Sequence, residues 1–116
     1  MQILFLMADG FEETEFVTPF DYFQRAGFEV ALASVSGDSF VTGAHGLKIA
    51  ADFALSGADT AKFDAVLLPG GGPGVQRLKA SADVERVVCD FNDKNKWIFA
   101  ICAAPLVLSK AGLLVD

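Results

Sequence analysis

The stretch from Trp97 to Pro105, WIFAICAAP, constrains the fold of this chain more than any other segment. Its apolar first part is typical of a buried strand that stops at Cys102, and a helix is expected from Pro105. A sharp strand-to-helix turn of this kind displays its side chain above the end of a sheet and beside the free N–H groups of the next helix. Those groups favour negative charge. The segment therefore predicts a reactive thiolate at Cys102, against the alternative of a small, inert side chain in the core.

The rest of the chain alternates between strand-like and helix-like segments. Apolar or alternating runs predict strands at residues 2–8, 28–34, 40–42, 47–51, 63–68 and 97–100. Helices are expected at 12–26, 75–79, 82–92 and 105–111, with Pro19 kinking or breaking the first of them. This alternation predicts an α/β fold with a mostly parallel sheet and helices on both faces.

Three loops should meet at the carboxyl ends of such strands, where open α/β sheets place their sites. They span residues 9–15, 69–74 and 102–104. The glycine loop at 69–74, PGGGPG, lacks the spacing of a dinucleotide or P-loop motif. We expect its glycines to bring backbone N–H groups close to the cysteine, forming an anion pocket with the Ala103 N–H, although a plain turn is the simpler alternative.

The first of these loops carries four carboxylates, Asp9, Glu12, Glu13 and Glu15. Most of them are expected to be solvated charges at the start of a helix. One could instead point into the site and share a proton with the thiolate, or several could bind Mg²⁺. A receiver-domain interpretation is weak because the last predicted strand runs into Ile101 and Cys102, where that fold needs a lysine. His45 is the only histidine, and it is interpreted as a surface residue that could also serve a site.

Composition narrows the class of protein. The chain has 116 residues, 53% of them hydrophobic, which is the size of one domain and enough for a buried core. A net charge of −6 argues against nucleic acid or an anionic membrane surface as a partner. No apolar run is long enough to cross a membrane, and the N-terminal segment lacks the basic start of a signal peptide. The only cysteines, Cys89 and Cys102, fit neither a CxxC motif nor the spacing of a zinc ligand pair, so a cytoplasmic location is expected.

Taken together, the motifs resemble the DJ-1/ThiJ/PfpI superfamily, and within it the DJ-1 and YajL-like branch. The matching segments occur in family order at residues 9–15 (DGFEETE), 19–21 (PFD), 25–27 (RAG), 68–71 (LPGG) and 100–105 (AICAAP). The resemblance implies a flavodoxin-like sandwich, a homodimer and an oxidisable cysteine at Cys102. It also implies that Glu15 is the carboxylic acid that hydrogen-bonds the cysteine, and that Gly71 and Ala103 are backbone donors of the anion pocket.

The chain departs from the family pattern in three places. Ala103 stands where the protease branch carries a histidine, so proteolysis is not expected. His45 occupies the position of an arginine that the partner subunit usually supplies to the cysteine pocket. Residues 1–116 are expected to form a single DJ-1/PfpI-like domain that lacks the family's C-terminal strands, its C-terminal helix and a later histidine.

The resemblance implies two functions of different kinds. One is glyoxalase or protein-deglycase chemistry on 2-oxoaldehydes or their adducts, with a small carbonyl compound or a glycated protein as the partner and no cofactor or metal. The other is a non-enzymatic oxidative-stress sensor or chaperone that uses oxidation of Cys102. A third hypothesis, a metal-dependent phosphate enzyme using Asp9 and Glu12, is disfavoured by the poor phosphate motifs.

Overall fold

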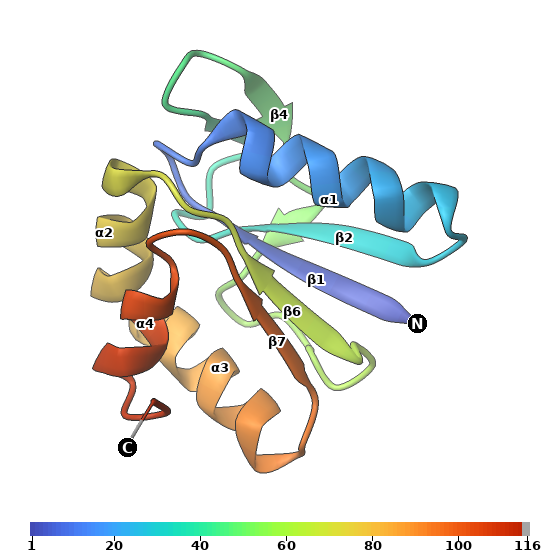
Figure 1. Cartoon of the computed structure of the whole chain (residues 1–116), viewed down its shortest axis with the longest axis vertical. Coiled ribbons are helices and arrows are strands. Elements are labelled where there is room, and N and C mark those ends of the chain that lie inside the picture. Colours follow the sequence, from blue (N-terminus) through green and yellow to red (C-terminus); the bar gives the residue numbers. More distant parts are fainter. Residues whose placement is uncertain (115–116) are drawn as a thin grey trace.

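A five-stranded parallel sheet in the order β5-β2-β1-β6-β7 forms the centre of the computed structural model, which describes residues 1–114 (Figure 1). A separate antiparallel pair, β3 and β4, joins β2 to β5. The strands are β1 Gln2–Met7, β2 Glu29–Ser34, β3 Phe40–Thr42, β4 Lys48–Ala50, β5 Phe53–Ala54, β6 Ala65–Leu68 and β7 Trp97–Ala100. The helices are α1 Glu13–Arg25, α2 Gly72–Ala80, α3 Ala82–Asp93 and α4 Pro105–Lys110. The predicted α/β, flavodoxin-like class is confirmed.

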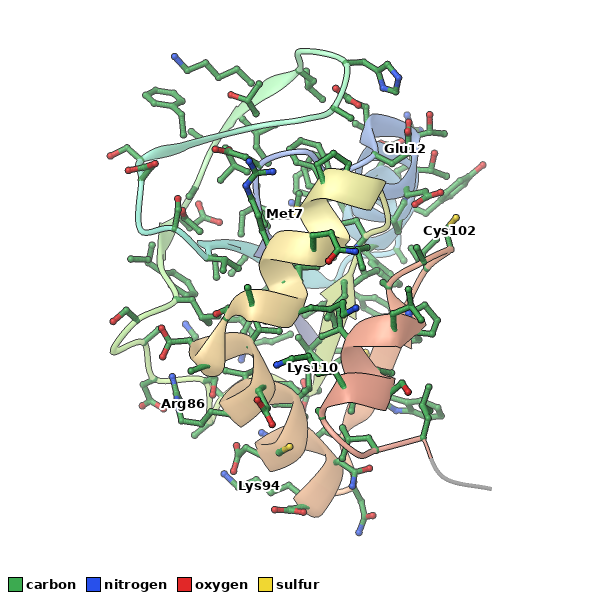
Figure 2. All side chains as sticks on the ribbon, turned by 90° about the vertical axis from the view of Figure 1, so that its left-hand side faces the viewer. Met7, Glu12, Arg86, Lys94, Cys102 and Lys110 are labelled. Carbon is green, nitrogen blue, oxygen red and sulfur yellow. The ribbon has the colours of Figure 1, made fainter. Side chains whose placement is uncertain are left out.

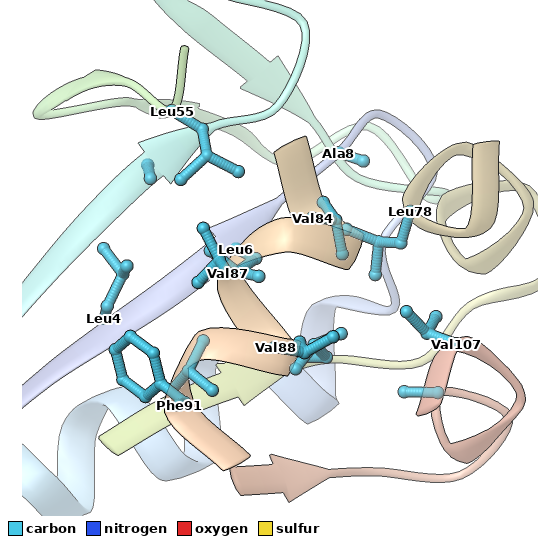
Figure 3. Packing of buried hydrophobic residues seen from close by; sticks show 14 of the residues in the cluster. Leu4, Leu6, Ala8, Leu55, Leu78, Val84, Val87, Val88, Phe91 and Val107 are labelled. Carbon is cyan, nitrogen blue, oxygen red and sulfur yellow. The ribbon is translucent and has the colours of Figure 1, made fainter. Parts of the chain in front are cut away.

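The helices form two layers on the sheet, with α1 on one face and α2, α3 and α4 on the other (Figure 1). Side chains of β1 alternate between these layers, as the two-residue period of a strand requires. Leu4 and Leu6 point into the core beneath α3, which contributes Val88 and Phe91 (Figure 3). Phe5 points into the opposite core, beneath α1. The buried strands therefore read as continuous apolar runs, because both of their faces are covered.

The path of helix α1 past Pro19 differs from one of the outcomes that the sequence predicts. Helix α1 runs unbroken from Glu13 to Arg25 through Pro19, where the sequence predicts a kink or a break. Phe16 and Phe20 pack edge-on against Phe5 of the sheet, and this packing on both sides of the proline holds the helix against the loss of one backbone hydrogen bond.

The connections also differ in extent. Helix α2 begins at Gly72, three residues before the predicted start at Val75, because a proline in the first turn is compatible with a helix. The two-residue strand β5 was not predicted, since it is too short to show a period and exists only through its pairing with β2. No helix within residues 1–114 is long and apolar enough to span a bilayer.

Candidate functional site

Cys102 occupies the sharp turn between β7 and α4. Its backbone is left-handed, with φ of 58°, a conformation that costs a non-glycine residue energy and is concentrated at functional sites. The turn is closed by a hydrogen bond from the Ala104 N–H to the Ile101 carbonyl at 3.0 Å. The side chain is exposed, and its sulfur lies at the surface beside the start of α4 (Figure 2). The geometry of the predicted strand-to-helix turn is therefore present.

Glu15 reaches toward the same place from the first turn of α1. The residue is half-buried, and its Oε1 atom is fully buried without a hydrogen-bond partner among the described residues. A side chain added at Gly70 would overlap Oε1 and would lie 3.0 Å from the Cys102 Cβ atom. Gly70 thus separates the carboxyl group from the cysteine. The expected hydrogen bond from Glu15 to the sulfur is not formed here, because the Cys102 side chain turns outward to solvent.

The glycine loop is clamped against the loop that follows β1. The Glu12 N–H donates to the Gly70 carbonyl at 2.9 Å. Gly71 has φ of 101°, and a side chain there would lie 2.5 Å from the Gly10 carbonyl oxygen. Glycine is required at this position for both reasons, since other residues rarely adopt this backbone angle and no space exists for a Cβ atom. The structure therefore brings together the three loops that the sequence placed at the carboxyl edge of the sheet.

Two backbone donors near the cysteine are free. Within residues 1–114, the N–H groups of Gly71 and Ala103 donate to no protein acceptor. Ala103 follows the cysteine directly, and Gly71 follows the glycine that contacts Cys102. Unpaired N–H groups of this kind can hold an anion or a developing oxyanion. These are the two donors that the family resemblance implies.

Glu13 and His45 form a second cluster, where the start of α1 meets the connection between β3 and β4. The His45 Nδ1 atom lies 3.0 Å from Glu13 Oε1 and 3.8 Å from Glu12 Oε2. Desolvation acts to raise the pKa of Glu13, but hydrogen bonds from the His45 ring and from the N–H groups of Leu47 and His45 outweigh it and lower that pKa to about 2. The hydrogen bond to Glu13 raises the pKa of His45, with further attraction from the charges of Glu12 and Glu13. His45 is therefore an organised residue and not an isolated surface histidine.

The other sequence candidates have structural partners. Asp9 accepts a hydrogen bond from the Thr42 N–H at 2.9 Å and so fastens β3 to the loop after β1. In the described part of the chain, the ligand atoms close enough to share a metal come from Glu12, Glu13 and His45, and Asp9 is not among them. The structure therefore does not bring Asp9 and Glu12 together as the metal ligands that a phosphate enzyme would need.

Sequence reasoning did not find the role of Glu13. Glu13 and His45 are 32 positions apart, and no periodicity or motif pairs them. Gly43 offered the only local signal, because a side chain at that position would overlap the Glu13 carboxylate.

Comparison with known proteins identifies the group to which this site belongs. A model of the DJ-1/PfpI family matches residues 1–116. The chain belongs to the DJ-1/PfpI family. A deglycase of Thermococcus kodakarensis is 38% identical over 117 residues, which cover 98% of this chain and 68% of that protein. YraA of Bacillus subtilis, whose name suggests a cysteine protease, is 36% identical over 114 residues, which cover 97% of this chain and 66% of that protein.

A solved DJ-1/PfpI relative shares the arrangement of the elements. The structure of oxidized DJ-1 from Toxoplasma gondii superposes with a TM-score of 0.92 at 36% identity, covering 97% of this chain and 62% of that one. The chain thus spans about two thirds of the length of these three relatives. The DJ-1/PfpI membership and the fold are established by these matches, and deglycases are among the relatives.

Proposed function

We propose that this chain carries the reactive-cysteine centre of a DJ-1-like protein that acts on 2-oxoaldehydes or on their adducts with proteins. The observation that carries the proposal is the convergence of an exposed cysteine in a left-handed turn, a buried carboxyl oxygen without a partner and two free backbone donors. Relatives named as deglycases support the same class of chemistry. The cytoplasm, a reducing compartment, is the location that fits a free thiol in this role.

The proposed reaction begins with addition of the Cys102 thiolate to the aldehyde carbon. A carbon–sulfur bond forms, and the electron pair of the carbonyl moves onto its oxygen, which the N–H groups of Gly71 and Ala103 would hold. Glu15 then moves a proton between the two carbons of the bound aldehyde, so that one carbon is oxidised while its neighbour is reduced. Water finally cleaves the resulting thioester, which releases a 2-hydroxy acid and restores the thiol.

A homodimer is part of the proposal. Helix α1 leaves Val17 and Tyr22 exposed, at 43% and 67%, on the side that faces away from the sheet. Phe16, Phe20 and Phe23 of α1 pack on the chain's own sheet, so these two exposed residues are the basis for an interface on this helix. In such a dimer, His45 of the partner subunit would stand near the cysteine pocket.

The enzymatic proposal is tested by methylglyoxal turnover. We expect wild type to convert methylglyoxal to a 2-hydroxy acid, and Cys102→Ser to lose that activity. Cys89→Ser is the matched control, because Cys89 lies in α3 with its sulfur 3.9 Å from the Ala111 carbonyl oxygen. Activity that survives in Cys102→Ser, or no turnover by a folded, fully reduced wild type, would contradict the enzymatic proposal.

A second function, redox sensing, is favoured by the exposure of the Cys102 sulfur. The oxidized relative of known structure is consistent with it. Two successive reactions with peroxide would add one oxygen each to the sulfur and release one water each, giving a sulfinate. Intact mass after graded peroxide separates the two functions. A sensor gains two oxygens at Cys102 under mild peroxide without turning over methylglyoxal. Oxidation of Cys89 and Cys102 to the same extent would argue against a sensor.

A further inference from the structure

The carboxylate of Glu13 organises the whole loop between β3 and β4. Its Oε2 atom accepts hydrogen bonds from the N–H groups of His45 at 2.7 Å and Leu47 at 3.1 Å. Its Oε1 atom lies 3.0 Å from Nδ1 of the His45 ring. One side chain on α1 therefore fixes both the backbone of the loop and the orientation of the imidazole. With only 17% of its side chain exposed, this carboxylate is largely shielded from competing water.

The surrounding backbone is built to receive this carboxylate. Gly43 has no Cβ atom, and any side chain at this position would overlap the Glu13 carboxylate. The Ala44 N–H donates to the Phe11 carbonyl at 2.8 Å, and the Gly43 N–H donates to the Leu47 carbonyl at 2.7 Å. Hydrogen bonds from the N–H groups of Ala44, His45 and Leu47 thus hold the loop against the start of α1. This backbone frame places the His45 main chain beside Glu13, and the contact between Nδ1 and Glu13 Oε1 then orients the ring.

The chemistry of the pair decides which ring nitrogen carries hydrogen. An ionised carboxylate can only accept hydrogen bonds, so the facing Nδ1 atom must donate one. In the neutral ring the single proton then resides on Nδ1, and Nε2 has a free lone pair. We propose that Glu13 is a positioning residue that locks His45 in the Nδ1–H form and leaves Nε2 as the nitrogen that accepts a proton or hydrogen bond from a ligand.

Exposure and charge support this assignment. The His45 side chain is 71% exposed, so a ligand with an acidic hydroxyl or thiol group can reach the ring. Glu12 lies 3.8 Å from Nδ1, too far for a hydrogen bond, and therefore adds charge without selecting a tautomer. Glu13 sets the tautomer of His45 whether or not Cys102 is catalytic.

Nitrogen NMR of the whole chain tests the proposal directly. His45 is the only histidine, so histidine labelled with ¹⁵N gives one pair of ring signals that needs no further assignment. Above the pKa of the ring, we expect the shifts of a protonated Nδ1 and an unprotonated Nε2, the reverse of the preference of a free histidine side chain. In Glu13→Gln the population should move toward Nε2–H, and the pKa of His45 should fall.

Glu12→Gln is the matched control, because it removes a neighbouring charge without removing the hydrogen bond. We expect this variant to keep the Nδ1–H form while its His45 pKa falls by a smaller amount than in Glu13→Gln. A wild-type ring protonated at Nε2 would overturn the proposal without any variant. Retention of Nδ1–H in Glu13→Gln would overturn it as well, and so would a loss of Nδ1–H in Glu12→Gln equal to that in Glu13→Gln.

Discussion

Replacing Gly70 by alanine tests how tightly the candidate site is packed. The added methyl group would overlap Oε1 of Glu15 and would lie 3.0 Å from both the Cys102 Cβ atom and the Ile101 carbonyl oxygen. The Ile101 backbone cannot retreat freely, because its N–H donates a hydrogen bond to the Leu68 carbonyl at 3.1 Å. Glu15, a side chain with rotatable bonds, is the group that should move.

The expected cost follows from overpacking. Forcing one extra methyl group into a filled site costs about 1–3 kcal/mol of unfolding free energy. For a domain of this size, a loss of 1 kcal/mol lowers Tm by about 4 °C, so the total fall should be about 4–12 °C. The displaced Glu15 should also change the alkylation rate of Cys102, since the carboxyl group and the cysteine flank the same glycine.

Gly72→Ala is the control from the same loop. Apart from its chain neighbours and the backbone of its own helix, a Cβ atom there would meet nothing within 4 Å, and the residue begins helix α2. Alanine there should therefore cost less stability than alanine at Gly70, since its methyl group meets only the mild restriction that Pro73 places on the residue before it. Urea unfolding gives the free energies, and iodoacetamide labelling followed by mass spectrometry gives the rates. Equal stability of Gly70→Ala and Gly72→Ala, or an unchanged labelling rate in Gly70→Ala, would refute the packing argument.

Three further outcomes are expected. Iodoacetamide at neutral pH should label the exposed Cys102 before the half-buried Cys89. Peptide mapping that finds Cys89 labelled first would contradict the proposal that Cys102 is the reactive thiol. Because the pKa of Glu13 falls from 4.5 to about 2 on folding, the stability that wild type gains over Glu13→Gln should be lost as the pH falls from 4.5 toward 2. The part of that gain that comes from the charged His45 ring should be lost as the pH rises through the raised pKa of His45, so the gain should be largest between pH 4.5 and 6.5. Urea unfolding across both ranges measures the gain, and a pH-independent difference between the two proteins would count against it. Phe91→Ala should lower the free energy of unfolding by about 3–5 kcal/mol because the ring is fully buried. Phe40→Ala, at a position 52% exposed, should lower it far less, and equal denaturation midpoints of the two variants would contradict this expectation.

The sequence by itself determined the elements whose signal is local. The apolar runs of β1 and β6 are continuous because both faces of a central parallel strand are buried, so they could be recognised without knowing their neighbours. The turn at Cys102 was equally visible, because an apolar strand, a cysteine and a helix-starting proline follow one another within a few residues. Three of the family motifs follow the same principle, since residues 9–15, 68–71 and 100–105 are short segments that each form one loop at the carboxyl edge of the sheet.

Tertiary structure alone decided the features that depend on distant residues. Strand β5 exists through its pairing with β2, and helix α1 survives Pro19 because its phenylalanines pack on the sheet. The orientation of Cys102 relative to Glu15 is also a tertiary property, since the two side chains come from opposite ends of the chain and meet only at Gly70. The bond between Glu13 and His45 is the clearest case, because hydrogen bonds are set by the final positions of two atoms and not by the pattern of residues between them.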